Sequence, residues 1–263
     1  MSYSQTLQAD DPNHFNIWKP FGETNPPAIQ ELQQNPNSWC THKLYDYSWD
    51  DRIQELLPNF QGLGWRLALD WFDFIEYTPE LKHTTPIEYL EIGTLHGANL
   101  LSVHMTYASH PQSHMTIIDP YKDYSEYEEY KGEQQLNLTT LCNNLNYFKV
   151  PKSKISLHRN LSHMVLPTLQ ENFYDLVYID GNHTRKNVLE DAILSWRKLK
   201  PGGFLVFDDF DWGNSDIPGG CPKDAIRCFV YGYAHEIQCH KEMHGQYLVM
   251  KQGDQGALKL CKE

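Results

Sequence analysis

The sequence predicts a doubly wound α/β fold with a mostly parallel sheet of seven strands, closed by an antiparallel strand near the C-terminus. Three observations support this expectation. Short apolar runs alternate with amphipathic stretches, a turn with two glycines follows the first run, and acidic residues stand where several runs end. Strands that alternate with helices along a chain form βαβ units, and such units build parallel sheets with helices on both faces.

The predicted strands are short apolar runs, each followed by sequence compatible with a helix. Five of them are expected to run parallel, at residues 87–92, 115–118, 155–158, 176–179 and 204–207. A further helix is expected near 223–233, and two closely spaced β-like runs follow at 236–240 and 246–251. We interpret these last two runs as an antiparallel hairpin that closes the sheet.

The chain is expected to hold one large domain after an N-terminal extension. Residues 1–62 are polar, rich in Asn, Gln and Pro, and weakly periodic, which indicates an arm or cap. A domain over 63–263 is predicted, in which an amphipathic helix at 65–77 packs on the sheet before the first strand. The acidic, tyrosine-rich segment 121–132 is interpreted either as a solvated loop or as part of a substrate-binding wall.

Composition narrows the choice of partners. The formal net charge is −12, so attraction to the phosphate backbone of a nucleic acid is unfavourable. The cysteines lie apart without a C-x-x-C pair, which favours reduced thiols in the cytoplasm. No apolar stretch approaches the roughly 20 residues that span a bilayer, so a membrane partner is not expected. The expected partner is a small molecule, and a homo-oligomer is left open.

The strongest motif is YLEIGTLHGANLLSVHM at residues 89–105, which predicts a strand, a tight turn with Gly93 and Gly97, and a helix. Glycine lets the turn form and lets a ligand approach the backbone, while the helix N-terminus offers free N–H groups. Leu95 stands where the dinucleotide fingerprint has its middle glycine, which disfavours a pyrophosphate-containing cofactor. The turn therefore indicates a nucleotide-like ligand without phosphates.

Asp119 ends the second predicted strand in the segment IIDPY. A carboxylate at this place can accept hydrogen bonds from both ribose hydroxyls of an adenosine. The alternative is an ordinary strand-end aspartate that starts a turn before Pro120. The glycine turn on the preceding unit favours the ribose interpretation.

A second set of carboxylates follows the later strands, with Asp180 in YIDGNH and Asp208 and Asp209 in VFDDFDW. The carboxyl ends of neighbouring parallel strands meet at one edge of a sheet, so these side chains are expected to converge. Converging carboxylates repel one another unless a cation binds, and oxygen ligands suit Mg²⁺ or a similar divalent cation. The alternative is that they cap helices or face solvent. His183 is the candidate general base, because imidazole accepts a proton near neutral pH; a purely structural histidine is the alternative.

Over residues 65–251 the chain resembles the class I S-adenosylmethionine (SAM)-dependent methyltransferases, which have a Rossmann-like fold. More narrowly, it resembles the metal-dependent O-methyltransferases related to catechol O-methyltransferase and the macrolide sugar O-methyltransferases. The resemblance implies that Glu91, Gly93 and Gly97 wrap the methionine part of SAM and that Asp119 binds its ribose. LKPGG at residues 199–203 also matches the family, as a structural turn.

The same resemblance implies further site residues. The segment NLSHMVLPTL at 160–169 looks like the family segment that lines the adenine, which nominates Ser162 and His163, although Ser162 is alternatively a helix cap. The family's metal ligands fall at the three aspartates named above. A histidine at position 183 is what the sugar-modifying relatives show, whereas the catechol enzymes have a lysine near this place.

These observations predict an enzyme that transfers a methyl group from SAM to a hydroxyl of a sugar-like or phenolic small molecule with the help of Mg²⁺ or a similar cation. The catalytic residue is expected to be His183. The expected cofactor-binding residues are Glu91, Gly93, Thr94, Gly97, Asn99, Asp119, Ser162, His163 and Asp180, and the expected metal ligands are Asp180, Asp208 and Asp209. A metal-independent methyltransferase and a non-catalytic SAM-binding module remain as alternatives, whereas Leu95 makes a nicotinamide oxidoreductase the weaker choice.

Overall fold

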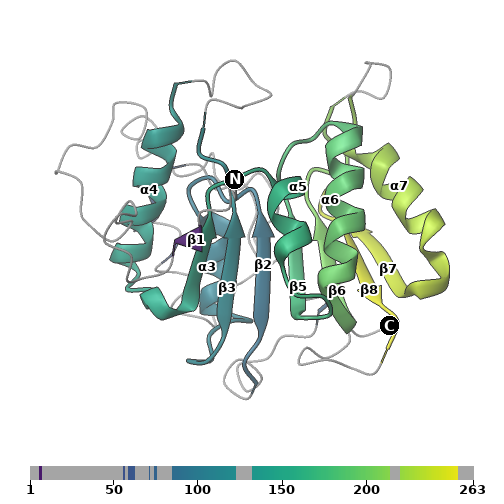
Figure 1. Cartoon of the computed structure of the whole chain (residues 1–263), viewed down its shortest axis with the longest axis horizontal. Coiled ribbons are helices and arrows are strands. Elements are labelled where there is room, and N and C mark those ends of the chain that lie inside the picture. The colour runs from purple at the N-terminus through teal and green to yellow at the C-terminus, as the bar shows by residue number, and fades with distance from the viewer. Residues whose placement is uncertain are drawn as a thin grey trace.

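The computed structural model of this chain describes residues 6–7, 56, 59–62, 71, 74–75, 85–122, 132–213 and 220–253. In these residues, helices cover both faces of a central sheet (Figure 1). The strands are β1 (Thr6–Leu7), β2 (Glu88–Ile92), β3 (His114–Ile118), β4 (Ile155–His158), β5 (Tyr174–Ile179), β6 (Leu199–Phe207), β7 (Ile237–Met243) and β8 (Gln246–Lys251). The α-helices are α3 (Ala98–Met105), α4 (Gln134–Tyr147), α5 (Ser162–Val165), α6 (Arg185–Lys198) and α7 (Pro222–Gly232). Short 3-10 helices are η5 (Lys152–Lys154), η6 (Leu166–Thr168) and η7 (Ala234–Glu236).

The sheet has the strand order β1-β4-β3-β2-β5-β6-β8-β7. Strands β2 to β6 pair in parallel, whereas β8 is antiparallel to β6 and β7 is antiparallel to β8. The predicted doubly wound sheet with an antiparallel C-terminal hairpin is therefore confirmed. The two-residue β1, antiparallel to β4, is an additional edge strand that no sequence pattern predicted. Chain order reverses between β2 and β5, and open α/β sheets bind ligands at the carboxyl ends of strands next to such a reversal.

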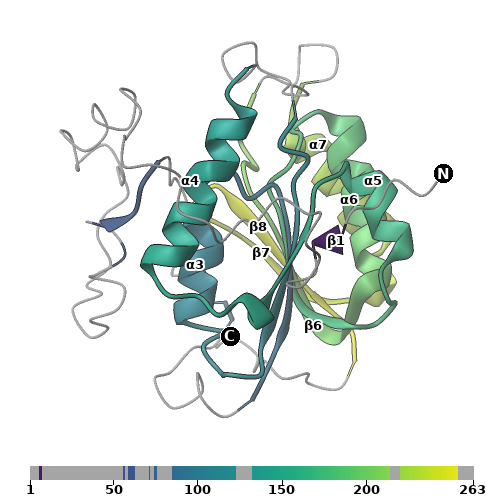
Figure 2. The same ribbon diagram turned by 60° about the vertical axis from the view of Figure 1, so that its left-hand side comes forward.

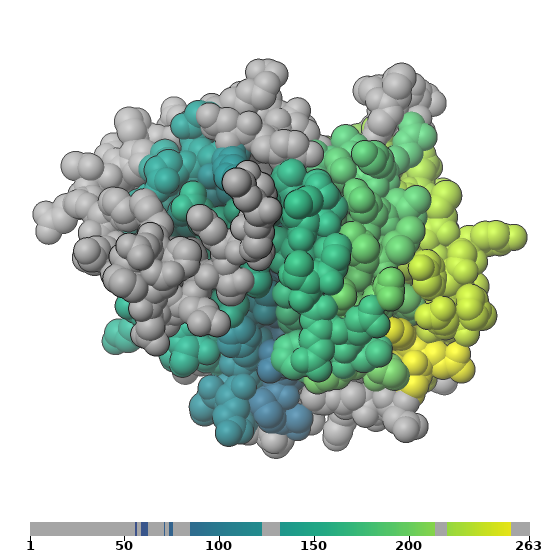
Figure 3. Space-filling model, in the orientation of Figure 1, coloured from purple at the N-terminus to yellow at the C-terminus, as the bar shows by residue number. Residues whose placement is uncertain are grey.

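Two apolar cores lie on opposite faces of the sheet. Every residue of β5 is buried, and its side chains alternate: Leu176 and Tyr178 belong to one core, whereas Val177 and Ile179 belong to the other. Figure 2 shows α3 and α4 on one side of the sheet and α5, α6 and α7 on the other. In Figure 3 the green and yellow-green atoms of α5, α6 and α7 form a continuous surface. Because both faces are covered, the parallel strands appear in the sequence as continuous apolar runs.

Strand β6 begins at Leu199, earlier than the predicted start at 204. Leu199 already pairs with Tyr174 of β5, and the register then shifts before Leu176 pairs with Phe204. A Cβ on Gly203 would lie 2.9 Å from the backbone oxygen of Asp175, so the strands approach closely at this irregularity. The glycines of LKPGG thus lie within an irregular strand rather than in a turn before it.

The core reaches upstream of the predicted domain boundary. Leu56 and Phe60 are buried, although they fall within the predicted arm. Of the predicted helix at 65–77, only Trp71, Phe74 and Ile75 lie within the described residues, and all three are buried. The rest of that helix, most of the arm and most of segment 121–132 lie outside the described residues. None of the helices in the described ranges is long and apolar enough to cross a lipid bilayer.

Candidate functional site

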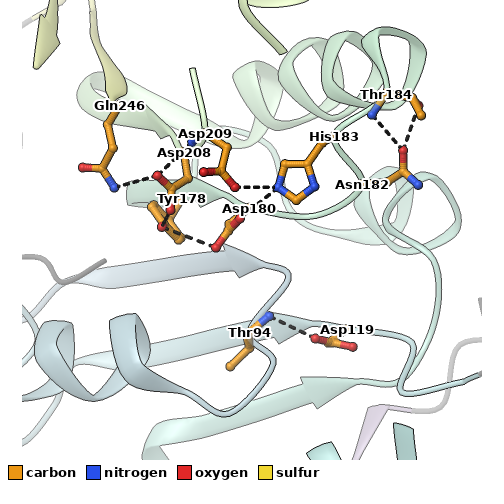
Figure 4. Close-up of polar contacts among 10 residues, drawn as sticks. All are labelled: Thr94, Asp119, Tyr178, Asp180, Asn182, His183, Thr184, Asp208, Asp209 and Gln246. Atoms are coloured by element: carbon orange, nitrogen blue, oxygen red, sulfur yellow. Dashed lines mark hydrogen bonds and ion pairs between the residues drawn. The ribbon is translucent and has the colours of Figure 1, made fainter. Parts of the chain in front are cut away.

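The candidate site lies at the carboxyl edge of the sheet, where loops follow β2, β3, β5 and β6 (Figure 4). Two groups of residues meet there. The first is the glycine loop, residues 93–97, with Asp119 beside it. The second is the acid–histidine cluster, which consists of Asp180, His183 and Asp209. The residues that the sequence nominated for these two groups therefore lie at the same edge of the sheet.

The glycine loop has a backbone that other residues would strain. Gly93, Leu95 and Gly97 have φ angles of 79°, 47° and 85°, in the left-handed region. A Cβ on Gly93 would lie 1.9 Å from the backbone oxygen of Asp180, so the loop packs directly against the end of β5. Glycine at position 93 is therefore required both by conformation and by this close approach.

Asp119 holds the glycine loop through the backbone. Its Oδ2 accepts hydrogen bonds from the N–H groups of Thr94 and Leu95, each at 3.0 Å. Its Oδ1 accepts the N–H of Tyr121 at 3.1 Å, and the Tyr121 hydroxyl donates to the Leu95 oxygen at 2.7 Å. Burial raises the pKa of Asp119, while these N–H donors act in the opposite direction. A carboxylate has about four acceptor positions, so Asp119 keeps acceptor capacity for a ribose hydroxyl. Its predicted contact with both ribose hydroxyls stays a prediction.

Glu91 lies beneath the loop in a small polar network. Its Oε2 accepts the Tyr89 hydroxyl at 2.5 Å and the Asn99 amide at 3.3 Å, and that amide also donates to the Tyr89 oxygen at 2.8 Å. Burial raises the pKa of Glu91 to about 7, and its hydrogen bonds oppose the rise. The Oδ1 atom of Asn99 is buried without a hydrogen-bond partner among the described residues. An acceptor is thus left for a donor on a ligand.

The predicted adenine residues lie on α5, on the other side of the sheet from α3. Ser162 is partly buried and its side chain hydrogen-bonds Asp191 of α6, while burial raises the pKa of Asp191 to about 7. The N-cap of α5 is Leu161, so the alternative role of Ser162 as the cap is wrong. His163 is exposed. Contact of these two residues with an adenine stays a prediction.

The acid–histidine cluster is compact. The His183 Nε2 atom lies 2.9 Å from Asp209 Oδ2 and 3.4 Å from Asp180 Oδ1. One possible ligand atom from each of the three side chains lies within 4.8 Å of the others. Burial raises the pKa of Asp180 well above its usual value, and the charges of Asp208 and Asp209 raise it further, whereas His183 lowers it. Among the described residues of the cluster, His183 is the group that opposes this rise.

Asp208 is placed differently from the other two predicted ligands. It is buried, its Oδ2 accepts the Tyr178 hydroxyl at 2.5 Å, and its Oδ1 accepts the Asp209 N–H at 2.8 Å and the Gln246 amide at 3.2 Å. The structure thus groups Asp180 and Asp209 with His183. The Asp208 carboxylate accepts three hydrogen bonds within the protein, and its predicted role as a metal ligand stays a prediction. Sequence reasoning missed Gln246 and Tyr178. The available signal was a tyrosine in the apolar run 176–179, two residues before Asp180.

The donor set fits a divalent cation. Two facing carboxylates suit Mg²⁺ or Mn²⁺. Trp212 lies beside this group, with its ring centroid 6.0 Å from that of His183, and half of the residue is exposed. The cluster therefore has an exposed aromatic neighbour on the side open to solvent.

Comparison with known proteins identifies the region that holds both groups. A family model described as a methyltransferase domain matches residues 90–210. An uncharacterized protein, R132, from Acanthamoeba polyphaga mimivirus is 26% identical over 150 residues, which is 56% of this chain. The match spans 63% of the length of that curated relative. The family match covers the glycine loop, Asp119 and the whole acid–histidine cluster.

Solved structures share the fold. A protein from Corynebacterium glutamicum is similar with a TM-score of 0.51 and 15% identity, over 86% of this chain and 98% of its own. A putative O-methyltransferase from Klebsiella pneumoniae has a TM-score of 0.50 and 14% identity, over 88% of this chain and 92% of its own. The MycE methyltransferase of the mycinamycin biosynthetic pathway, in complex with Mg, SAH and mycinamycin VI, has a TM-score of 0.50 and 15% identity, over 78% of this chain and 54% of its own.

Proposed function

We propose that the protein transfers the methyl group of SAM to a hydroxyl of a small molecule with the help of a divalent cation. The match of residues 90–210 to a methyltransferase domain supports this proposal. One observation carries the proposal. Gly93 of the cofactor loop lies against the backbone of Asp180, so a methyl donor on the loop is adjacent to the acid–histidine cluster.

The cofactor side fits SAM by its chemistry. The methionine part carries an ammonium group, and the buried Asn99 Oδ1 offers it an acceptor beside Glu91. The remaining acceptor position of Asp119 takes one ribose hydroxyl. The loop presents backbone N–H groups, two of which already bind Asp119, so little capacity for a pyrophosphate remains. This favours a cofactor without phosphates over a dinucleotide.

On the acceptor side, Asp180 and Asp209 would hold the cation, which would lower the pKa of the acceptor hydroxyl. His183 takes the hydroxyl proton as the oxygen attacks the methyl carbon and the carbon–sulfur bond breaks, which leaves S-adenosylhomocysteine (SAH). The Asp209 carboxylate at 2.9 Å stabilises the imidazolium that forms. Holding oxygen, carbon and sulfur in line is the larger contribution, worth up to roughly 7–11 kcal/mol in favourable systems.

The proposed acceptor is a ring compound with a hydroxyl, either a sugar or a phenol. The exposed Trp212 beside His183 supports this choice, because an indole face packs against sugar rings and aromatic rings alike. The MycE neighbour, solved in complex with Mg, SAH and mycinamycin VI, supports a small-molecule acceptor.

The test combines binding and turnover. Calorimetry should show SAH binding to the purified chain, and a panel of sugars and phenols should yield methylated product with Mg²⁺ and none with EDTA. Asp209→Asn should abolish the effect of Mg²⁺, whereas Asp211→Asn, at an exposed aspartate that pairs with Lys223, is the matched control. Turnover that is indifferent to EDTA would favour the metal-independent alternative. SAH binding without product from any acceptor would favour a non-catalytic module.

A further inference from the structure

A buried chain of polar side chains lies behind the acid–histidine cluster. It consists of Trp71, Gln246, Asp208 and Tyr178, and we call it the Asp208 network. The Trp71 indole N–H donates to Gln246 Oε1 at 2.8 Å, and the Gln246 amide donates to Asp208 Oδ1 at 3.2 Å. Trp71 and Gln246 are fully buried although 175 residues separate them in the chain. The network therefore joins the segment before β2 to the first residue of β8.

The network reaches the cluster at the backbone of Asp209, and its Tyr178 hydroxyl lies 3.5 Å from Asp180 Oδ2. Asp208 Oδ1 accepts the Asp209 N–H at 2.8 Å, and Asp209 has a φ angle of 52°. A residue other than glycine in this left-handed region is strained by roughly 1–3 kcal/mol and needs surrounding contacts to hold it there. From this conformation the Asp209 carboxylate reaches His183 at 2.9 Å, and Figure 4 shows both pointing toward Asp180.

We propose that Gln246 and Trp71 are positioning residues for the acid–histidine cluster: they fix the Asp208 carboxylate, which holds the turn that aims Asp209 at Asp180 and His183. This inference rests on the proposed function, because it takes the cluster as the place where the cation binds. It gives the internal partners of Asp208 a role in the site, because they set the direction of its carboxylate.

Packing alone does not account for a glutamine at position 246. A fully buried amide loses its hydration, and an apolar side chain of similar size would fill the space without that cost. Both ends of the Gln246 amide are instead engaged, one as acceptor from Trp71 and one as donor to Asp208. Tyr178 completes the set from β5, where its ring lies 5.4 Å from that of Trp71. The groups thus fix the direction in which the Asp208 carboxylate points.

The experiment measures Mn²⁺ binding to the full chain in the presence of SAH, by electron paramagnetic resonance of the free ion. Gln246→Leu removes both hydrogen bonds and is expected to weaken Mn²⁺ binding about tenfold or more, in the range seen for residues that orient metal ligands. Trp71→Phe keeps an aromatic ring and removes only the N–H, so a smaller loss of about threefold is expected. Gln238→Leu, at an exposed glutamine of β7, is the matched control and should bind Mn²⁺ as the wild type does.

SAH affinity by calorimetry separates positioning from general damage. The inference requires SAH binding within twofold of wild type in both network variants. Unchanged Mn²⁺ affinity in folded Gln246→Leu overturns it, and so does a parallel loss of SAH and Mn²⁺ affinity in Trp71→Phe, which would indicate a merely structural role. Failure of the wild type itself to bind Mn²⁺ contradicts the proposed metal assistance, which is a different result from a variant that binds as well as the wild type.

Discussion

The glycine loop and the acid–histidine cluster lie next to each other at one sheet edge, yet their polar groups are satisfied in opposite ways. Around the loop, Asp119 accepts three backbone N–H groups and Glu91 accepts a hydroxyl and an amide. In the cluster, His183 lies between Asp180 and Asp209, and the Tyr178 hydroxyl lies 3.5 Å from Asp180 Oδ2. In the first region both carboxylates are used by hydrogen bonds within the protein, and the buried Asn99 Oδ1 is left for a ligand. The second region has fewer such partners and carries charge that a cation would balance.

This difference shows how the two halves of one site can be built. The cofactor half is the glycine loop with Asp119 and Glu91, and the acceptor half is the acid–histidine cluster. A cofactor loop has to present a fixed backbone, so its carboxylate is used inside the protein to hold that backbone. A metal-assisted half has to keep its carboxylate oxygens available, so it accepts repulsion when no cation is bound. Substitutions can act on one half, on the other half, or on the contact between them.

The largest effect is expected where the two halves touch. Gly93→Ala should destabilise the chain by roughly 4 kcal/mol or more and abolish SAH binding, because strain and steric overlap add. The new Cβ would meet the Asp180 backbone oxygen at 1.9 Å. Chemical denaturation and calorimetry measure both results. Gly132 has a φ angle of 84° with open space around it, so Gly132→Ala measures the backbone strain alone. Gly232→Ala introduces neither this strain nor a steric overlap. A Gly93→Ala protein no less stable than Gly132→Ala would show that the two halves do not depend on this contact.

Removing one carboxylate from the cluster should affect only the acceptor half. Asp209→Asn is expected to lower methyl transfer on the order of 100-fold or more, since metal assistance is worth several kcal/mol. SAH affinity should remain within twofold, because the loop's hydrogen bonds are untouched. Single-turnover rates and SAH calorimetry make the comparison, with Asp211→Asn as control. A matching fall in SAH affinity would mean that the halves are one unit.

The sequence predicted the first half better than the second. Gly93, Gly97 and Asp119 follow strands whose apolar runs are evident, and the parallel order brings strand ends to one edge. The orientation of side chains at that edge is decided by partners far away in the chain. Gln246 and Trp71 turn Asp208 inward, and neither lies near it in sequence. Adjacent aspartates 208 and 209 therefore looked equivalent, although only one faces His183.

The free energy of unfolding, measured against pH, should distinguish the cofactor half from the acceptor half. Burial raises the pKa of Glu91 from 4.5 to about 7, so the folded state holds this proton more tightly than the unfolded state does. The stability from this group is fully present below about pH 4.5 and is lost as pH rises toward 7, by on the order of 2–3 kcal/mol. Glu91→Gln should lack that loss in denaturation curves of the ligand-free chain.

Mg²⁺ distinguishes the two sources of pH dependence. Asp180 also has a raised pKa, so its contribution falls in the same direction with rising pH. A cation stabilises the ionised Asp180, so Mg²⁺ should reduce the loss of stability that Asp180 causes as pH rises. The loss caused by Glu91, measured as the difference between wild type and Glu91→Gln, should stay unchanged. An equal response of both parts to Mg²⁺ would contradict the division into a self-satisfied half and a cation-dependent half.

The smallest effect is expected at Trp212, whose uncharged ring lies beside His183 in the acceptor half. The residue is 50% exposed and its ring lies 6.0 Å from that of His183, so it contributes little to the core. Trp212→Ala should leave SAH affinity, Mn²⁺ affinity and stability unchanged, within about 0.5 kcal/mol for an exposed position. The KM for a sugar or phenol acceptor should rise about tenfold, which corresponds to the roughly 1–2 kcal/mol of lost ring contact. Tyr231→Ala, at an 89% exposed aromatic residue on α7, is the control. If KM stays constant while kcat falls, Trp212 acts on His183 rather than on the acceptor, because loss of ground-state contact alone would raise KM and spare the chemical step.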